Sequence, residues 1–191
     1  MTPGMRWVSR ETNPDGAERR VTVTITNRTK TLANGVVARI VRDTVTENGK
    51  LVEDTVDLYA QDREGNVWHL GEDTKEYENG KVTSAAGSFE AGVDGAQAGI
   101  AMPAHPKPGL RYRQEYYAGQ AEDRAEIVAV GQQAQVPAGH YEGVVMTRDL
   151  NPLEPTHVEV KFYAPGVGPV LAIGVSGSSD REELLRVSRG G

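Results

Sequence analysis

Polar and apolar residues alternate along most of this chain, which is the pattern of β-strands that bury one face of a sheet. Val21, Val23 and Ile25, for example, alternate with threonines. Short groups rich in glycine, asparagine, aspartate and proline separate the alternating runs. Only residues 180–187 offer a helical alternative. The pattern predicts an all-β antiparallel meander of about ten to twelve strands, forming a curved sheet or partly closed β-barrel with negligible helix.

Three turns organise the segment between residues 36 and 91. Asn48-Gly49 and Asn79-Gly80 are dipeptides that tolerate the positive φ angles of a tight hairpin loop. The turn at 62–66, which contains Gly65, suits a slightly longer loop with a bulge. These turns join four strand-like runs into a meander with defined registers. Before residue 36 the turns do not fix a register.

The registers expected from these turns bring three acids onto one otherwise apolar face. Asp43 is expected to pair with Asp54, and Glu72 to lie one strand further on. Carboxylates this close repel, so a bound cation, a shared proton or the nearby Arg39 has to offset the cost. The plain alternative is that the acids point into water at the open end of the barrel. The same face is expected to carry Val41, Val45, Val52, Val56, Leu58, Ala60, Trp68, Leu70 and Phe89, and the wetter opposite face to carry Arg42, Thr55, Asp57, Tyr59, His69 and Asp73.

Composition and charge narrow the class of protein. The length of 191 residues predicts one β domain spanning 1–191, with a long proline-rich loop at 92–109. The chain has no cysteine, which excludes disulfides, thiolate metal sites and cysteine nucleophiles. Thirteen of the 27 acidic residues lie between Asp43 and Asp94, and no basic stripe is present, so nucleic-acid binding is not expected. No apolar run is long enough for a transmembrane helix.

The usual catalytic motifs are absent from the sequence. It contains no nucleophile elbow, phosphate loop, dinucleotide fingerprint or EF-hand loop, and its four histidines lack metal-ligand spacing. The candidate metal ligands are therefore Asp43, Asp54 and Glu72. Their oxygens suit calcium, magnesium or manganese, and adding His69 or His105 would suit zinc. The candidate catalytic residues are Asp54, Glu72, His69 and His105.

Several segments resemble a family of secreted bacterial β-proteins. Residues 162–170, Phe-Tyr-Ala-Pro-Gly-Val-Gly-Pro-Val, resemble the closing hairpin of those proteins, and 136–144 resembles the element before it. The opening residues 3–7 are similar to the start of the mature domain, after an export signal. These proteins in turn resemble the lipoprotein-carrier half-barrels, in which a curved antiparallel sheet surrounds an apolar cavity. The resemblance implies a secreted or cell-envelope protein whose export signal is not in this chain.

Three functions fit these observations, and whether the chain is an enzyme stays open. The first is an exported protein that binds a small amphipathic or lipid-like ligand, with an acidic rim around an apolar concave face. The expected lining residues are Trp68, Leu58, Leu70, Phe89 and Tyr112. The second is a metal-dependent hydrolase whose ion, held by the acid cluster, lowers the pKa of a bound water. The third is an envelope structural or interaction module.

Overall fold

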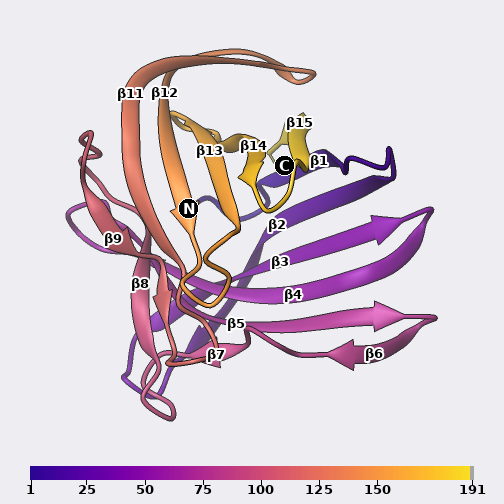
Figure 1. Ribbon diagram of the computed structural model, residues 1–191. Coiled ribbons are helices and arrows are strands. Elements are labelled where there is room, and N and C mark those ends of the chain that lie inside the picture. The colour runs from indigo at the N-terminus through magenta and orange to yellow at the C-terminus, as the bar shows by residue number, and fades with distance from the viewer. Residues whose placement is uncertain (190–191) are drawn as a thin grey trace.

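The structure is a computed structural model that describes residues 1–189, and within that part of the chain it contains β-strands and no helix (Figure 1). The alternating pattern therefore predicted the fold class correctly. The strands are β1 (Arg6–Thr12), β2 (Glu18–Thr31), β3 (Val37–Glu47), β4 (Lys50–Gln61), β5 (Val67–Glu78), β6 (Lys81–Ser84), β7 (Phe89–Glu90), β8 (Gln97–Met102), β9 (Arg111–Arg113), β10 (Glu115–Tyr116), β11 (Arg124–Val136), β12 (Gly139–Leu150), β13 (Val158–Ala164), β14 (Gly168–Ser176) and β15 (Arg181–Ser188).

All strand pairs are antiparallel, and the sheet runs in the order β10-β8-β5-β4-β3-β2-β1-β15-β14-β13-β12-β11-β9. The short strands β6 and β7 pair with β5 beside this path. The expected ten to twelve strands are too few, because 15 strands form and 13 of them lie on the path. The excess comes from β8, which lies in the segment expected to be a loop, and from two strand-like runs that each break into two short strands, β6 with β7 and β9 with β10.

One short segment nearly closes the sheet into a barrel. Strand β9 pairs with β11 at one end of the path, and β10, which follows almost at once, pairs with β8 at the other end. The chain at Gln114 passes so close to β8 that a Cβ atom added to Gly99 would lie 2.2 Å from the Gln114 carbonyl carbon. Glycine at position 99 is therefore a requirement of closure.

A bulge in the β3–β4 hairpin corrects the first predicted register. Glu47 pairs with Lys50 as expected, but the register shifts between Val45 and Thr46. Asp43 consequently pairs with Thr55, and Asp54 pairs with Thr44. The prediction that Asp43 faces Asp54 is wrong, and Asp54 lies on the opposite face of the sheet from Asp43.

A second bulge lies in β5. Tyr59 pairs with His69 but Leu58 pairs with Gly71, so Leu70 is the extra residue. Glu72 therefore pairs with Asp57 and not with Val56 as expected. In Figure 1, β3, β4 and β5 form adjacent long strands, and these two bulges decide which of their side chains point into the barrel.

The segment 92–109, predicted to be one long loop, contains strand β8 at Gln97–Met102. The glycine-rich start forms a turn in which the amide of Gly92 donates to the carbonyl of Ala96. The prolines that argued against a strand all follow β8, so the irregular part is shorter than expected. No helix in the described chain is long and apolar enough to cross a membrane.

The buried apolar residues form four separate clusters instead of one continuous core. The accessible surface is 10427 Å², while a filled globular protein of 20.6 kDa exposes roughly 8,900 Å². Long hairpins that extend beyond the barrel interior contribute to this excess. One cluster, Met5, Ile25 and Val41, faces that interior beside Trp7 and Tyr59.

Candidate functional site

The inner faces of β4 and β5 stack in four layers along the barrel. Each layer is one cross-strand pair, and successive layers are roughly 7 Å apart because side chains on one face recur every second residue. The pairs, from one mouth inward, are Glu53–Glu76, Thr55–Thr74, Asp57–Glu72 and Tyr59–His69. Two of the four layers thus place a carboxylate directly opposite a carboxylate, an arrangement that destabilises a sheet unless something offsets it.

The β5 bulge is the reason His69 and Glu72 share this interior. Residues three apart on a regular strand point to opposite faces. The extra residue at Leu70 restores the two side chains to one face. Asp57 lies across from Glu72, so a histidine and two carboxylates converge at one level of the barrel.

His69 lies at the centre of this group and is held on several sides. Its ring stacks on Tyr59 with centroids 4.8 Å apart and meets the edge of Phe89 at 5.2 Å. Its Nε2 lies 3.5 Å from Asp57 Oδ1 and its Nδ1 lies 3.4 Å from Glu115 Oε2. These are ion-pair distances longer than a good hydrogen bond, and Nε2 has no hydrogen-bond partner among residues 1–189.

The electrostatics of the interior are dominated by buried acids. Burial and the neighbouring acids, Asp57 first among them, raise the pKa of Asp43 to about 8. Burial and Glu115 likewise raise the pKa of Glu72 to about 8, against a lowering effect of His69. Burial alone would lower the pKa of His69, but the facing Asp57 and Glu115 carboxylates raise it to about 10. Carboxyl groups therefore outnumber basic side chains at this level, and the raised pKa values of Asp43 and Glu72 reflect the cost of ionising them together.

A second polar group lines the opposite wall. Lys161 Nζ lies 3.3 Å from Asp149 Oδ2 and 3.1 Å from Glu159 Oε2. Asp149 also accepts a hydrogen bond of 2.6 Å from Thr147. Lys161 is surrounded by protein, yet 33% of its side-chain surface remains accessible. An enclosed side chain with accessible surface indicates space inside the barrel.

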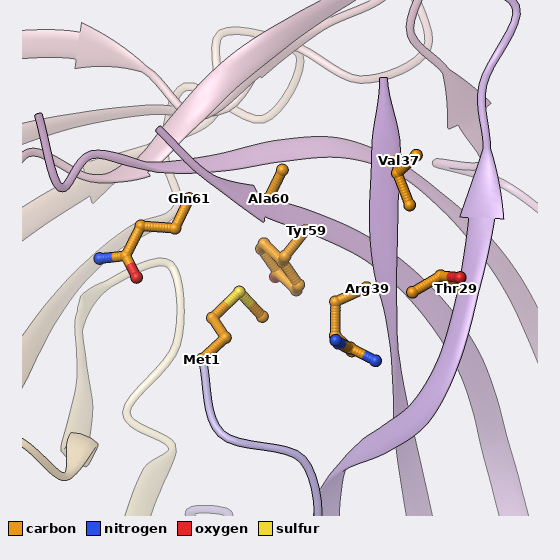
Figure 2. Close-up of a pocket in the computed structure, with 7 residues that line it drawn as sticks. All are labelled: Met1, Thr29, Val37, Arg39, Tyr59, Ala60 and Gln61. Carbon is orange, nitrogen blue, oxygen red and sulfur yellow. The ribbon is translucent and has the colours of Figure 1, made fainter. Parts of the chain in front are cut away.

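The two mouths of the barrel differ in character. A groove of about 540 Å³ at the hairpin tips carries five glutamates and one arginine, Glu11, Glu47, Glu53, Glu76, Glu78 and Arg19. A pocket of about 310 Å³ at the other end lies beneath Tyr59 and is lined by Arg39 and Met1 among others. Figure 2 shows Met1, Tyr59 and the Arg39 guanidinium facing the same space. Tyr59 therefore separates this pocket from His69.

The structure separates the residues predicted as metal ligands and catalytic groups. Asp43, Glu72 and His69 lie in the interior. Asp54 lies on the outer face, where both of its oxygens accept hydrogen bonds from Arg42 at 2.8 and 2.9 Å. His105 is exposed in the turn after β8. The expected cluster of Asp43, Asp54 and Glu72 is thus corrected to one in which Asp57 takes the place of Asp54.

The predicted lining residues divide in the same way. Phe89 contacts His69, and the half-buried Tyr112 lies near Lys161, so both belong to the interior. Leu58, Leu70 and Trp68 do pack together, but on the outer face of β4 and β5, in a cluster with Leu32 and Ala38. The expectation that these last three face the concave side is wrong, because the bulges reverse the strand faces.

Asp57, Glu115 and Asp123 are interior acids that the sequence pattern did not single out. Glu115 and Asp123 come from the closing segment, far along the chain, and no local pattern marks them. Asp57 was assigned to the wetter face. A signal for it existed in Gly71, because an isolated glycine within a strand pattern indicates a bulge.

No protein-family model and no curated protein matches this chain. Among solved structures, a protein from Parabacteroides distasonis ATCC 8503, described as a "putative lipoprotein", aligns over 98% of this chain and 96% of its own, with a TM-score of 0.49 and 13% identity. A likeness at this level carries no inference about what this chain binds or where it acts.

Proposed function

We propose that this protein is a small-ligand binding barrel whose ligand is an amphipathic organic cation held in the interior. The observation that carries the proposal is the convergence of buried acids on a hollow, partly aromatic interior. The inward acids with raised pKa are Glu11, Asp43, Glu72, Asp123 and Glu182. His69 and Lys161 lie among them and Arg19 contacts Glu11 at 3.6 Å, but the acids outnumber these bases, so a positively charged ligand would offset the remaining repulsion.

The apolar part of the ligand also has surfaces to contact. The cluster of Met5, Ile25 and Val41 lies on the same inner face as Asp43 and is flanked by Tyr59. Aromatic rings favour organic ammonium groups, each such contact contributing about 0.5–2 kcal/mol. The sequence suggested an amphipathic or lipid-like ligand. A fatty acid is such a ligand but fits this interior poorly, because its carboxylate would join an already acidic interior.

The acidic groove gives the ligand a route of entry. Five glutamates around one mouth attract cations and repel anions before any contact forms. Export remains part of the proposal on the strength of the sequence resemblance alone: we expect the protein to bind its ligand in the cell envelope or outside the cell.

Titration with three amphiphiles of equal chain length tests the proposal. Dodecyltrimethylammonium, dodecanoate and dodecyl maltoside share one tail and differ in head-group charge. Below their micelle concentrations, isothermal titration should show saturable binding of the ammonium compound, about tenfold or more tighter than the other two. Equal binding of dodecanoate, or no saturable binding of the ammonium compound, would overturn the proposal.

A pair of variants locates the binding. Glu53→Gln combined with Glu76→Gln removes one cross-strand acid pair from the entry groove and should weaken ammonium binding several-fold. The matched control is Asp54→Asn, which removes a carboxylate from the neighbouring position on the outer face. The interior assignment fails if the control weakens binding as much as the double variant does.

A metal-dependent hydrolase is the second candidate function, and one observation favours it. Asp57, His69 and Glu72 each offer one ligand atom to a common point. An ion held there would lower the pKa of a bound water and supply a nucleophile near neutral pH. Hydrolysis of model esters or phosphoesters that is lost in Glu72→Gln and kept in Asp54→Asn would support this candidate.

A further inference from the structure

We propose that Asp57, His69 and Glu72 form a binding site for a divalent transition-metal ion, with Zn²⁺ as the best fit. The three ligand atoms all lie within 4.8 Å of one another. A tetrahedral zinc ion with ligands about 2.0–2.2 Å away holds those ligands about 3.4 Å apart. His69 Nε2 and Asp57 Oδ1 are already 3.5 Å apart, so only the longer Glu72 side chain has to move inward.

The unpartnered imidazole nitrogen is the independent observation. The side chain of His69 is only 9% exposed, and its Nε2 points into the cluster with no hydrogen-bond partner in the described chain. A protonated histidine bound directly to Asp57 would make a charge-assisted hydrogen bond of about 2.7–2.9 Å. The longer separation found here matches the spacing of two ligands of one ion, which would bind His69 as the neutral imidazole and displace the proton that Asp57 and Glu115 otherwise favour.

The other imidazole nitrogen supports the same conclusion. His69 Nδ1 faces Glu115 Oε2 at 3.4 Å, on the side of the ring away from Asp57. Metal-binding histidines usually direct their second nitrogen at a carboxylate or carbonyl, which fixes the tautomer and strengthens the ligand. Tyr59 and Phe89 pack against the ring and hold its plane. In this arrangement Nε2 of His69 is directed at the metal position and Nδ1 is directed at the Glu115 carboxylate.

The donor set selects the class of ion. One imidazole and two carboxylates suit Zn²⁺ and its neighbours better than Ca²⁺ or Mg²⁺, which prefer oxygen ligands alone. Three protein ligands leave a fourth position free for water or another molecule, as in catalytic zinc sites. This site deepens the hydrolase candidate above and shares Glu72 with the acids of the organic-cation proposal, but it lies at a different level of the barrel from the entry groove.

Metal uptake by the whole chain tests the proposal. Protein stripped with EDTA is titrated with Zn²⁺, and with Ca²⁺ and Mg²⁺ as competitors, and bound metal is counted by elemental analysis. We expect one Zn²⁺ per chain and little competition. Co²⁺ in place of Zn²⁺ should give the intense visible bands of four-coordinate cobalt. Absence of stoichiometric uptake would overturn the proposal.

Variants separate this site from surface histidines. Glu72→Gln should lower zinc affinity about tenfold to a hundredfold and His69→Gln should abolish stoichiometric binding. The matched control is Asp73→Asn, the next residue on β5, whose side chain points outward and pairs with Lys75. Unchanged affinity in Glu72→Gln with an intact thermal melt would contradict the assignment. All zinc titrations omit organic cations, so failure of one proposal leaves the other standing.

Discussion

Replacing Asp43 with asparagine should stabilise the protein at alkaline pH and have little effect in acid. The pKa of Asp43 is raised from 3.8 to about 8, first by burial and then by Asp57, and its Oδ1 has no hydrogen-bond partner within the described residues. Between these two values the folded protein holds a proton that the unfolded chain releases. The free energy of unfolding therefore falls as pH rises from about 4 towards 8.

The size of the effect follows from the shift. Each pH unit in that window corresponds to about 1.4 kcal/mol, so the three units from pH 5 to pH 8 set an upper bound of about 4 kcal/mol. Water inside the barrel raises the effective dielectric constant, and we expect about 2 kcal/mol. For a chain of this length that corresponds to roughly 4–8 °C in Tm. Asp43→Asn should therefore melt close to the wild type at pH 5 and several degrees higher at pH 8.

Thermal melts of both proteins at pH 5 and pH 8, followed by far-UV circular dichroism, measure this difference. Asp54→Asn is the control, because its carboxylate lies on the outer face against Arg42 and exposed ion pairs contribute about 0–1 kcal/mol. A gain for Asp43→Asn that is equal at the two pH values would refute the argument, since a pH-independent gain cannot come from a titrating carboxyl.

Three further variants test the fold, each by urea unfolding. Gly99→Ala should cost about 3 kcal/mol or prevent folding, because its Cβ would meet the backbone of Gln114 at 2.2 Å. Trp7→Phe should cost about 1–2 kcal/mol through loss of the 2.8 Å hydrogen bond from Nε1 to the Val167 carbonyl. Leu184→Ala should cost about 2–5 kcal/mol, because this side chain is 1% exposed. For each variant, an unfolding midpoint equal to that of the wild type would contradict the prediction.

The turn chemistry is what the sequence predicted best. Asn48 and Asn79 adopt φ angles of 51° and 52°, and each is followed by a glycine with φ of 76°. Gly65, with φ of 100°, occupies the bulged loop expected there. These are local requirements, decided by a few neighbouring residues, and the sequence carries them directly. The pairs beside the turns, such as Glu47 with Lys50, were correct for the same reason.

The predicted registers further from the turns were wrong because a bulge is set by the shape of the whole sheet and not by the few residues of a turn. Long strands in a closing barrel must twist and bend, and extra residues at Val52 and Leu70 accommodate that bend. An apolar residue at a bulge leaves the alternating pattern almost unchanged. Counting residues from a hairpin turn therefore predicts the correct pairs near the loop and the wrong faces beyond the bulge. The prediction consequently placed Asp54 on the inner face and Asp57 on the outer face, the reverse of what the structure shows.

The acids on the outer and inner faces of β4 and β5 have different partners. This difference argues that the interior acids form a site and are not simply charges at a solvated rim. Asp54 and Asp73, on the outer faces of β4 and β5, each contact a base, Arg42 and Lys75. Asp57 and Glu72, pointing inward from the same two strands, face each other and His69 instead. The chain places neutralising bases on the outer face, where water already screens the charge. It leaves the interior acids, which water screens less, without such bases on these two strands. Such an interior is balanced most simply by a cation that comes from outside the chain.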